Sequence, residues 1–413
     1  MMICPICKNT KFNQLLNLVS GGFDGSFLYD PVIVLCCKKC GHILIQLSNK
    51  DKVNMLKYSE TEYPQNTMGS QNNSGDLPGN FNANSTARYD LLFQFIKPEL
   101  NKSYSILDIG CATGGFLKHI KQQGYINLYG IEMSQMYVDI AKQDKDLVIK
   151  CGLAEQLPYN NNQFDFLVAD QVVEHLFDPN KIFIEAKRIL NKDGLFCISV
   201  PNAELYDDYL FFDFLWFIMR EHVQHFDLLH LTALAGIHGF ELLKHSAYPY
   251  PMTSTTTSLP TLFLLFKYTG NKISYSYQPN YFNLKHTIEE YIRHSYKHLE
   301  EKAKIIQPIY ESGEPLYIFG ISKEFYYLYN NTNLNKCNII ELVDDTSYKQ
   351  QFLTFDSRKI VGRDVLKNGK ESVLITAIAH TDTIKHILTN LNFKGKVIEF
   401  CLLKPAKDLQ YYE

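Results

Sequence analysis

The stretch of this chain that most constrains its fold is residues 106–117, which read ILDIGCATGGFL. The apolar residues around Asp108 predict a strand inside a parallel sheet, because such a strand is covered on both faces. Gly110, Gly114 and Gly115 then allow a tight turn and a close approach of the backbone to a ligand. The turn has neither the G-x-G-x-x-G spacing of dinucleotide sites nor a Gly-Lys-Ser/Thr phosphate loop. It predicts an α/β domain that holds a nucleoside-like cofactor.

A second carboxylate supports this prediction. Residues 128–132 are predicted to form the next strand, which ends in Glu132 about twenty residues beyond the glycine-rich turn. A carboxylate at this place accepts hydrogen bonds from a ribose diol, so Glu132 is the predicted ribose ligand. The same reasoning predicts further strands at 147–150, 164–169 and 195–200 and a helix at 179–190.

The order of these elements resembles the class I S-adenosylmethionine (SAM) methyltransferases over about residues 85–268. The resemblance implies that Asp108 and Gly110 lie at the methionine end of the cofactor and Glu132 at the ribose. Leu153 stands where many relatives carry an aspartate, so adenine contacts fall to backbone groups or to Glu155. The alternative is that the carboxylates only cap loops. The predicted cofactor-binding residues are Asp108, Gly110, Gly114, Glu132, Ala154, Glu155 and Asp170.

Two C-x-x-C pairs near the N-terminus predict a structural zinc site. Cys4 and Cys7 form one pair, and Cys37 and Cys40 form the other, with an apparent β segment between them. Two such turns complete a tetrahedral shell of four thiolates, which leaves no open position for water. Cys36 could replace Cys37, although the spacing to Cys40 favours Cys37. The alternative is a redox pair, but neither pair lies in a thioredoxin-like strand and helix.

Residues 58–87 are rich in Asn, Ser and Gly and show no helical or strand periodicity. A long irregular loop in a compact protein is usually functional or disordered. Because it lies beside the predicted cofactor domain, this segment is either a substrate lid or a linker.

The dipeptide Glu221-His222 follows an aromatic insertion at 206–219 and is the predicted catalytic pair. A histidine titrates near neutrality, so His222 can take up a proton and return it, and Glu221 can orient the ring or raise its basicity. The alternative is that His222 and His225 are packing residues under the pocket. Glu174-His175 presents the same choice, and there a wall-forming role is favoured.

The C-terminal part predicts a second α/β unit. A long amphipathic helix is expected at about 284–310, followed by strands near 316–319, 338–343, 373–377 and 396–400. The chain thus divides into a zinc-binding module (1–57), a loop or lid (58–87), a SAM-dependent methyltransferase domain (88–283), and a connecting helix with a small Rossmann-like domain (284–413).

This three-part order resembles the sugar C-methyltransferases that act on nucleotide-linked 4-keto deoxysugars. Matching features are the four cysteines, the glycine-rich turn, the tyrosine-bearing loop from Tyr58, Glu221-His222, residues 320–323, and Val343-Asp344 with residues 348–350. The resemblance implies that His222 removes the proton α to the sugar ketone, with Glu221 as its partner, and that the enolate attacks the methyl group of SAM.

Met219 departs from the family pattern, which has a tyrosine two residues before the glutamate. Hydrogen-bond donors are needed at a developing oxyanion, and Tyr63, Tyr206 or Tyr209 could supply one. The departure keeps open an O- or N-methyltransferase acting on a surface-polysaccharide sugar, for which no enolate must form. A non-catalytic binding protein with the same fold is a further alternative.

Composition limits the remaining possibilities. The chain has 413 residues, 46% of them hydrophobic, 21% charged, and a net charge of −3, so we expect no nucleic-acid partner. The cysteine motif begins directly after residue 3, and the aromatic run near 209–219 is far shorter than the ~20 residues of a membrane span. We expect a cytoplasmic protein whose cysteines are thiols or metal ligands. The oligomeric state stays open.

Overall fold

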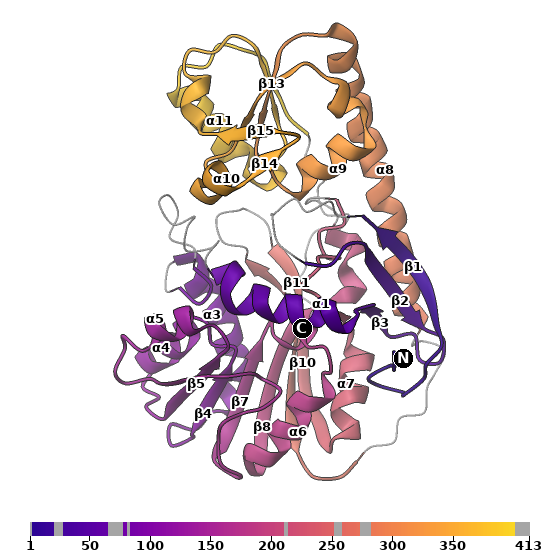
Figure 1. Cartoon of the computed structure of the whole chain (residues 1–413). Coiled ribbons are helices and arrows are strands. Elements are labelled where there is room, and N and C mark those ends of the chain that lie inside the picture. Colours follow the sequence, from indigo (N-terminus) through magenta and orange to yellow (C-terminus); the bar gives the residue numbers. More distant parts are fainter. Residues whose placement is uncertain are drawn as a thin grey trace.

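The computed structural model describes residues 2–19, 28–64, 77–80, 83–209, 214–251, 258–272 and 282–400. Its central element is a seven-stranded sheet with the order β10-β11-β8-β7-β4-β5-β6 (Figure 1). Strands β4 to β8 are parallel, and β10 and β11 form an antiparallel hairpin beside β8. The strands are β4 Ile106–Ile109, β5 Leu128–Glu132, β6 Val148–Cys151, β7 Phe164–Asp170, β8 Leu190–Pro201, β10 Phe240–Pro251 and β11 Ser258–Tyr268.

All four residues of β4 are buried, as the apolar pattern around Asp108 predicts. The glycine-rich turn leads from β4 into α4, and strand order reverses between β4 and β7, which places a crevice at the carboxyl ends of these strands. The predicted α/β class I methyltransferase fold is confirmed. The helices of this domain are α3 Ala83–Ile96, α4 Gly115–Gln122, α5 Gln135–Ala141, α6 Asn180–Ile189 and α7 Leu228–Ile237.

The N-terminal module forms an antiparallel sheet with the order β1-β2-β3-β9. Its first three strands are β1 Phe12–Leu18, β2 Val32–Cys37 and β3 Ile43–Ile45, but the fourth, β9 Gln224–His225, comes from the segment directly after Glu221-His222. The module is therefore joined to the central domain by strand pairing, which the sequence does not predict.

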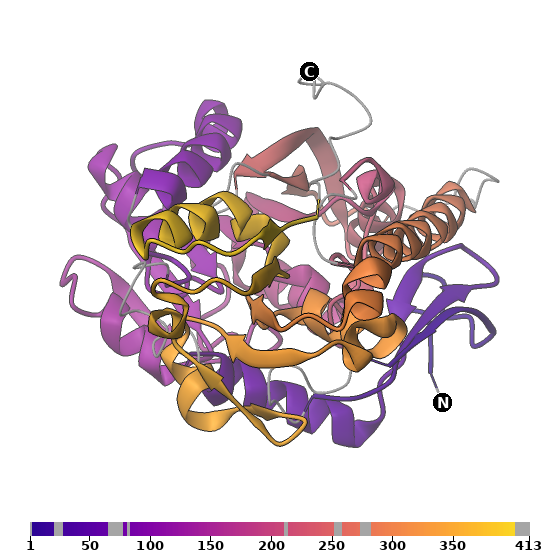
Figure 2. The ribbon, with the colours of Figure 1, turned by 90° about the horizontal axis from the view of Figure 1, so that it is seen from above.

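The C-terminal unit is a second α/β layer structure, at the top of Figure 1 and nearest the viewer in Figure 2. Its six strands have the order β14-β15-β13-β12-β16-β17 and are parallel except for the β14–β15 pair. The strands are β12 Leu316–Phe319, β13 Ile339–Val343, β14 Thr354–Phe355, β15 Arg358–Val361, β16 Ser372–Ile375 and β17 Val397–Ile398; the helices are α8 Asn283–Ser312, α9 Lys323–Asn331, α10 Ser347–Phe352 and α11 Thr381–Asn390.

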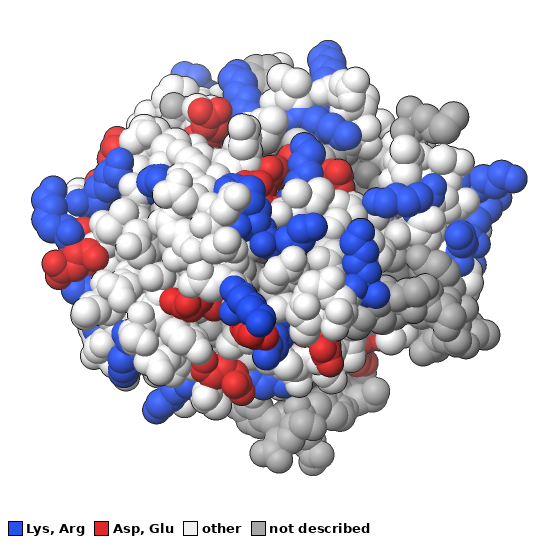
Figure 3. Space-filling view, turned by 90° about the horizontal axis from the view of Figure 1, so that it is seen from below, with Lys and Arg blue, Asp and Glu red and all other residues white. Residues whose placement is uncertain are grey.

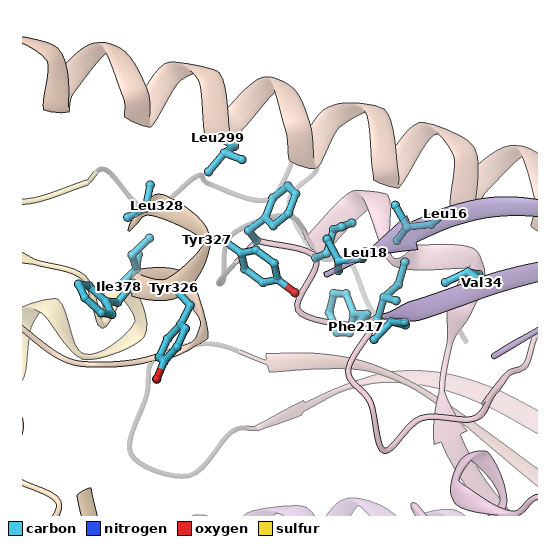
Figure 4. Close-up of a cluster of buried hydrophobic side chains, with 14 of the residues drawn as sticks. Leu16, Leu18, Val34, Phe217, Leu299, Tyr326, Tyr327, Leu328 and Ile378 are labelled. Carbon is cyan, nitrogen blue, oxygen red and sulfur yellow. The ribbon is translucent and has the colours of Figure 1, made fainter. Parts of the chain in front are cut away.

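One hydrophobic cluster, part of which is shown in Figure 4, contains side chains from all three parts. Leu16 and Val34 come from the N-terminal sheet, Phe217 from the aromatic insertion, Leu299 from α8 and Tyr327 from α9. Because burial of these side chains requires all of the elements together, we expect the parts to be positioned as one body.

The expectation of an irregular segment over 58–87 is wrong at both ends. Helix α1 (Asn49–Lys57) continues into a π-helical turn at Tyr58–Glu62, and α3 already begins at residue 83. Residues 65–76, 81 and 82 lie outside the described residues.

Within the described parts of the chain, no helix is both long and apolar enough to cross a bilayer. Charged side chains of both signs are interspersed on the face seen in Figure 3.

Candidate functional site

A cavity of about 630 Å³ lies at the carboxyl ends of β4, β5 and β7. It is lined by side chains from the glycine-rich turn, the segment after β6, the segment after β7, and the segment before β9. The structure thus brings together nearly all of the residues predicted from the sequence. The predicted site residues that line the cavity are Asp108, Gly110, Glu132, Ala154, Glu155, Asp170, Glu221 and His222.

Two glycines of the turn have different structural roles. Gly110 has φ 79°, and a Cβ added there would lie 2.6 Å from Cγ2 of Val172, so neither the backbone nor the space admits a larger residue. Gly114 has φ 81° and is the N-cap of α4. It is not among the residues that line the cavity, and a Cβ there would face Leu147. A cofactor contact by Gly114 stays a prediction.

Three carboxylates converge at the turn. Asp108 is 4% exposed, and burial, followed by Asp170 and Glu132, raises its pKa well above the usual value. Glu132 accepts backbone hydrogen bonds from Ala112 (3.1 Å) and Ser134 (2.9 Å), and burial raises its pKa as well. Because burial raises the pKa of both Asp108 and Glu132, the site fits a ligand with a cationic centre, such as the sulfonium and ammonium groups of SAM. Each Glu132 oxygen retains a lone pair for a ribose hydroxyl.

At the predicted adenine end of the cavity, the Glu155 side chain is already paired with a lysine. Ala154 and Glu155 line the cavity, as does Leu153. The Glu155 carboxylate, however, accepts a hydrogen bond from Lys181 Nζ at 2.9 Å. Of the two alternatives for adenine, this ion pair favours contacts from backbone groups over a contact from the Glu155 side chain.

His222 is 9% exposed and faces the cavity together with Glu221 and Met219. Burial lowers the pKa of His222 well below its usual value, and the nearby His175, His225 and Lys323 lower it further. The ring is therefore neutral near pH 7, and the same surroundings make it a weaker base than a solvent-exposed histidine. Among the described residues, no hydrogen bond joins the Glu221 and His222 side chains, so the orienting contact expected between them is not seen.

The other Glu-His pair lies in the short helix η3 (Val173–His175), directly after β7. Glu174 is 1% exposed, and neither carboxylate oxygen has a hydrogen-bond partner in the described structure. His175 lines the cavity, and its Nδ1 lies 2.9 Å from the backbone oxygen of Glu221. The ring centroids of His175 and His222 are 5.0 Å apart. The repeated Glu-His dipeptide was the available sequence signal for this arrangement.

Hydrogen bonds from the N-terminal module also hold the segment that contains Glu221 and His222. The Ile45 N–H donates to the oxygen of Val223 at 2.9 Å, and the Tyr29 hydroxyl donates to the backbone oxygen of Arg220. Gln224 has its Oε1 2.9 Å from His42 Nε2 and donates from Nε2 to the oxygen of Leu176 at 3.1 Å. The catalytic candidates are therefore fixed by both the module and the η3 segment.

Part of the predicted lid segment also reaches the cavity. Tyr58, Tyr63 and residues 77–79 line it, and the Thr113 hydroxyl donates to the oxygen of Pro78 at 3.0 Å. Of the tyrosines proposed as donors to an oxyanion, Tyr63 lines the cavity, whereas Tyr206 is buried with its hydroxyl 3.3 Å from His225 Nδ1. The side chain of Tyr209 lies outside the described residues.

The four cysteines of the N-terminal module form a cluster whose Sγ atoms all lie within 4.8 Å of one another. The Sγ atoms of Cys4 and Cys40 are 3.6 Å apart, and those of Cys7 and Cys37 are 3.4 Å apart. Tetrahedral Zn–S bonds of about 2.3 Å place thiolates roughly 3.8 Å apart, so the cluster fits a zinc ion. Cys36 Sγ instead faces the oxygens of Cys37 and Gly41.

Comparisons with known proteins agree with the fold. Residues 81–245 match the sequence model of a family described as "Methyltransferase domain". The chain is similar to an uncharacterized methyltransferase of Schizosaccharomyces pombe, 32% identical over 114 residues, which are 24% of this chain and 40% of that protein. It is also similar to a ubiquinone biosynthesis O-methyltransferase of Haemophilus ducreyi, 29% identical over 130 residues, 28% of this chain and 53% of that protein.

Among solved structures, the chain is similar to a SAM-dependent methyltransferase of Thermotoga maritima described as a possible histamine N-methyltransferase. The identity is 20%, the match covers 44% of this chain and 89% of that one, and the TM-score is 0.35. The chain spans less than half the length of the first curated relatives it matches. The matched family and the seven-stranded sheet with its glycine-rich turn show that the chain contains a class I SAM-dependent methyltransferase domain.

Proposed function

We propose that this protein is a SAM-dependent methyltransferase that C-methylates a nucleotide-linked keto-deoxysugar through an enolate. The observation that carries the proposal is the single cavity shared by the cofactor-side carboxylates and the Glu221-His222 segment. A methyl donor and an acceptor base must meet in one site, because transfer depends on positioning the acceptor in line with the methyl group.

The neutral state of His222 supports a proton-transfer role. A carbon α to a ketone becomes a nucleophile only after it loses a proton, whereas oxygen and nitrogen acceptors already carry a lone pair. His222 faces the cavity in its neutral form and is placed to take up this proton, which requires that the bound substrate raise its lowered pKa. The cofactor supplies the electrophilic methyl group, and Glu221, which lines the same cavity, is placed to bind the acceptor or relay the proton.

Stabilisation of the enolate oxygen is the weakest point of a metal-free reaction. Met219 lines the cavity and offers no hydrogen-bond donor. Tyr63 also lines the cavity, so of the three tyrosines considered as donors to the oxyanion it is the one that supports the proposal.

We also propose that Cys4, Cys7, Cys37 and Cys40 hold a structural zinc ion. The close approach of the four thiols supports this assignment, since a divalent cation lets them ionise together. Neighbouring thiols, Cys4 first, lower the pKa of Cys37 even without a cation. The zinc would stabilise the fold of the β2–β3 hairpin rather than take part in methyl transfer.

The second candidate function is O- or N-methylation of a sugar or another small acceptor. It is favoured by Met219, which is no handicap where no enolate forms, and by relatives whose names describe O- and N-methyltransferases. A non-catalytic SAM-fold binding protein is less favoured, because the cofactor-side carboxylates line the same open cavity as His175, Glu221 and His222.

Mass spectrometry of TDP-4-keto-6-deoxysugars incubated with the protein and SAM in deuterated water tests the proposal. One methyl group added on carbon, with α-deuterium exchange when SAM is omitted, is the expected result. A methyl group on oxygen or nitrogen without exchange supports the second candidate. Absence of both SAM binding and S-adenosylhomocysteine formation supports the binding protein.

A further inference from the structure

We propose that Glu174, His175 and His222 form a second metal site, which holds a divalent first-row metal ion at the wall of the cavity. Binding of the ion is independent of the proposed methyl transfer; its use in the reaction, as a Lewis acid at the acceptor oxygen, rests on that proposed function. The site is distinct from the four-cysteine cluster and comes from two segments far apart in sequence, η3 and the turn before β9.

The three side chains are close enough for a shared ion. One ligand atom from each lies within 4.8 Å of the others. Three atoms so placed share a point within about 2.8 Å of each, whereas metal–nitrogen and metal–oxygen bonds are about 2.0–2.2 Å long. Side-chain shifts of less than about 1 Å would complete the bonds, which is within the reach of ordinary rotamer adjustment.

Glu174 is the strongest sign of a missing partner. Both of its carboxylate oxygens are buried and lack a hydrogen-bond partner in the described part of the chain, and the residue is 1% exposed. Burying a carboxylate without a partner is costly, and native proteins pair such groups or use them to bind metals. The His222 Nδ1 is likewise buried without a partner among the described residues.

His175 has the orientation expected of a metal ligand. Its Nδ1 lies 2.9 Å from the backbone oxygen of Glu221, which fixes this nitrogen as the N–H donor. The other nitrogen, Nε2, is then an acceptor, and it lies 3.8 Å from Glu174 Oε1. A ligating histidine ordinarily donates its second nitrogen to a carbonyl or carboxylate in this way.

The charges around the three residues favour a cation. Asp170 faces Glu174 from the end of β7, and Glu221 lines the cavity beside His222. The cations nearby in the described part of the chain include Lys323 of α9, which donates from Nζ to the oxygen of Leu215 at 3.0 Å, and Arg88, which also lines the cavity. His225 lies on the far side of His222, with its Nδ1 directed to Tyr206.

One carboxylate and two imidazoles define the metal class. This donor set binds Zn²⁺ in catalytic zinc sites and Fe²⁺ in facial-triad sites, and in both it leaves coordination positions open to substrate. Because His175 and His222 line the cavity, the open positions would face the acceptor.

The ion would supply what Met219 does not. An acceptor ketone oxygen bound to the ion would carry the negative charge of the enolate. With His222 engaged as a ligand, Glu221 is the remaining base: its carboxylate takes the α proton, the carbon forms a bond to the methyl group, and the methyl–sulfur bond breaks to leave a neutral thioether. The same ion would acidify a hydroxyl group in the O-methylation alternative.

The test is the zinc content of the full-length protein after equilibration with micromolar Zn²⁺ and dialysis, measured by inductively coupled plasma mass spectrometry. The expected stoichiometry is two zinc ions per chain for the wild type and one for Glu174→Gln and for His175→Asn. Glu99→Gln, a surface glutamate paired with Lys244, should keep two ions. SAM binding measured on each variant verifies that it is folded.

The proposal is overturned if Glu174→Gln and His175→Asn both hold as many zinc ions as the wild type. Failure of the proposed function looks different: two zinc ions with no methyl transfer would leave the site standing and remove the reaction. Methyl transfer at full rate from protein with a single zinc ion would remove the site and leave the reaction.

Discussion

Glu174-His175 and Glu221-His222 are the same dipeptide, yet the structure uses their members in opposite ways. In the first pair the glutamate is buried and the histidine side chain is 40% exposed, facing the cavity; in the second the glutamate is partly exposed and the histidine is buried. The difference comes from the elements that carry the pairs: Glu174 lies in η3, which packs against β8 and β9, while His222 precedes β9, which pairs with β3. The chemistry of a dipeptide therefore depends on the element that carries it.

The two pairs are also tied to each other. His175 Nδ1 contacts the backbone oxygen of Glu221, and Gln224 donates to the oxygen of Leu176, so the segments that carry the two pairs are hydrogen-bonded to each other. A substitution in one pair is therefore expected to shift the backbone of the other. The variants below separate the effects of the two pairs on methyl transfer.

The largest effect is expected from His222→Asn. We expect methyl transfer to fall by about 10²- to 10⁴-fold, because a positioned acid or base contributes on this order. The measurement is single-turnover methyl transfer, with SAM affinity determined in parallel and expected to stay near the wild-type value.

The companion variants decide what His222 does. If it is only a base, Glu174→Gln should cost much less than His222→Asn. If the three residues act as one metal-binding unit, Glu174→Gln, His175→Asn and His222→Asn should cost similar amounts, since members of a unit are not additive. Full turnover by both His222→Asn and Glu221→Gln would remove the second pair from the mechanism.

Loss of the proposed four-cysteine zinc site should damage the second pair and spare the first. In Cys37→Ser the β2–β3 hairpin loses its anchor, and β9 loses the strand with which it pairs. Methyl transfer should fall by at least about tenfold, because displacement of the reacting groups by about 1 Å already costs on the order of 10²-fold. Hydrogen exchange should accelerate at Val223 and Gln224 but not in β5.

Cys36→Ser is the matched control for that experiment. Cys36 is adjacent in sequence, but its thiol faces backbone oxygens rather than the cluster. It should retain zinc, β9 protection and turnover. Equal losses in Cys36→Ser and Cys37→Ser would mean that the hairpin is sensitive to any substitution there and that zinc is not the cause.

The comparison also shows which parts were predictable. The glycine-rich turn and Glu132 follow from local patterns, since a buried strand and a tight turn are written in consecutive residues. The pairing of β9 with β3 was not predictable, because a two-residue strand has no periodicity and its partner lies far away in sequence. Nor does a Glu-His dipeptide reveal which member is buried. That depends on tertiary packing, so the sequence analysis favours a wall-forming role for Glu174-His175 without showing that Glu174 is buried.

A smaller effect is expected at the cofactor end, where Gly110 abuts the segment that leads to the first pair. In Gly110→Ala the new Cβ would meet Val172 at 2.6 Å, so the turn must move and SAM affinity should fall by about 10- to 100-fold. Gly124→Ala is the control, because φ is also positive (86°) but the nearest atom to its Cβ is Lys102 Nζ at 3.6 Å. Both variants should lose some thermal stability, and only Gly110→Ala should lose SAM affinity by calorimetry.

The smallest effect concerns pH and His225, which lies in β9 close behind the second pair and has no equivalent behind the first. Burial lowers the pKa of His225 to about 3, so the folded protein keeps this ring neutral while the unfolded chain takes up a proton below about pH 6.5. The unfolded state then binds more protons, and the free energy of unfolding should fall by about 1.4 kcal/mol for each pH unit below about 6.5. His225→Asn removes the contribution of His225 to this slope but not that of His42 or His238, whose pKa values burial also lowers to about 4. His286→Asn, on the exposed face of α8, keeps the contribution of His225. Urea unfolding at pH 6.5 and 5.5 measures the difference. Acid also weakens binding of metal by thiolates, but this loss of stability is common to both variants. Equal slopes in the two variants would contradict the prediction. They would show that β9 opens to solvent before the chain unfolds, and that the second pair is held less firmly than the first.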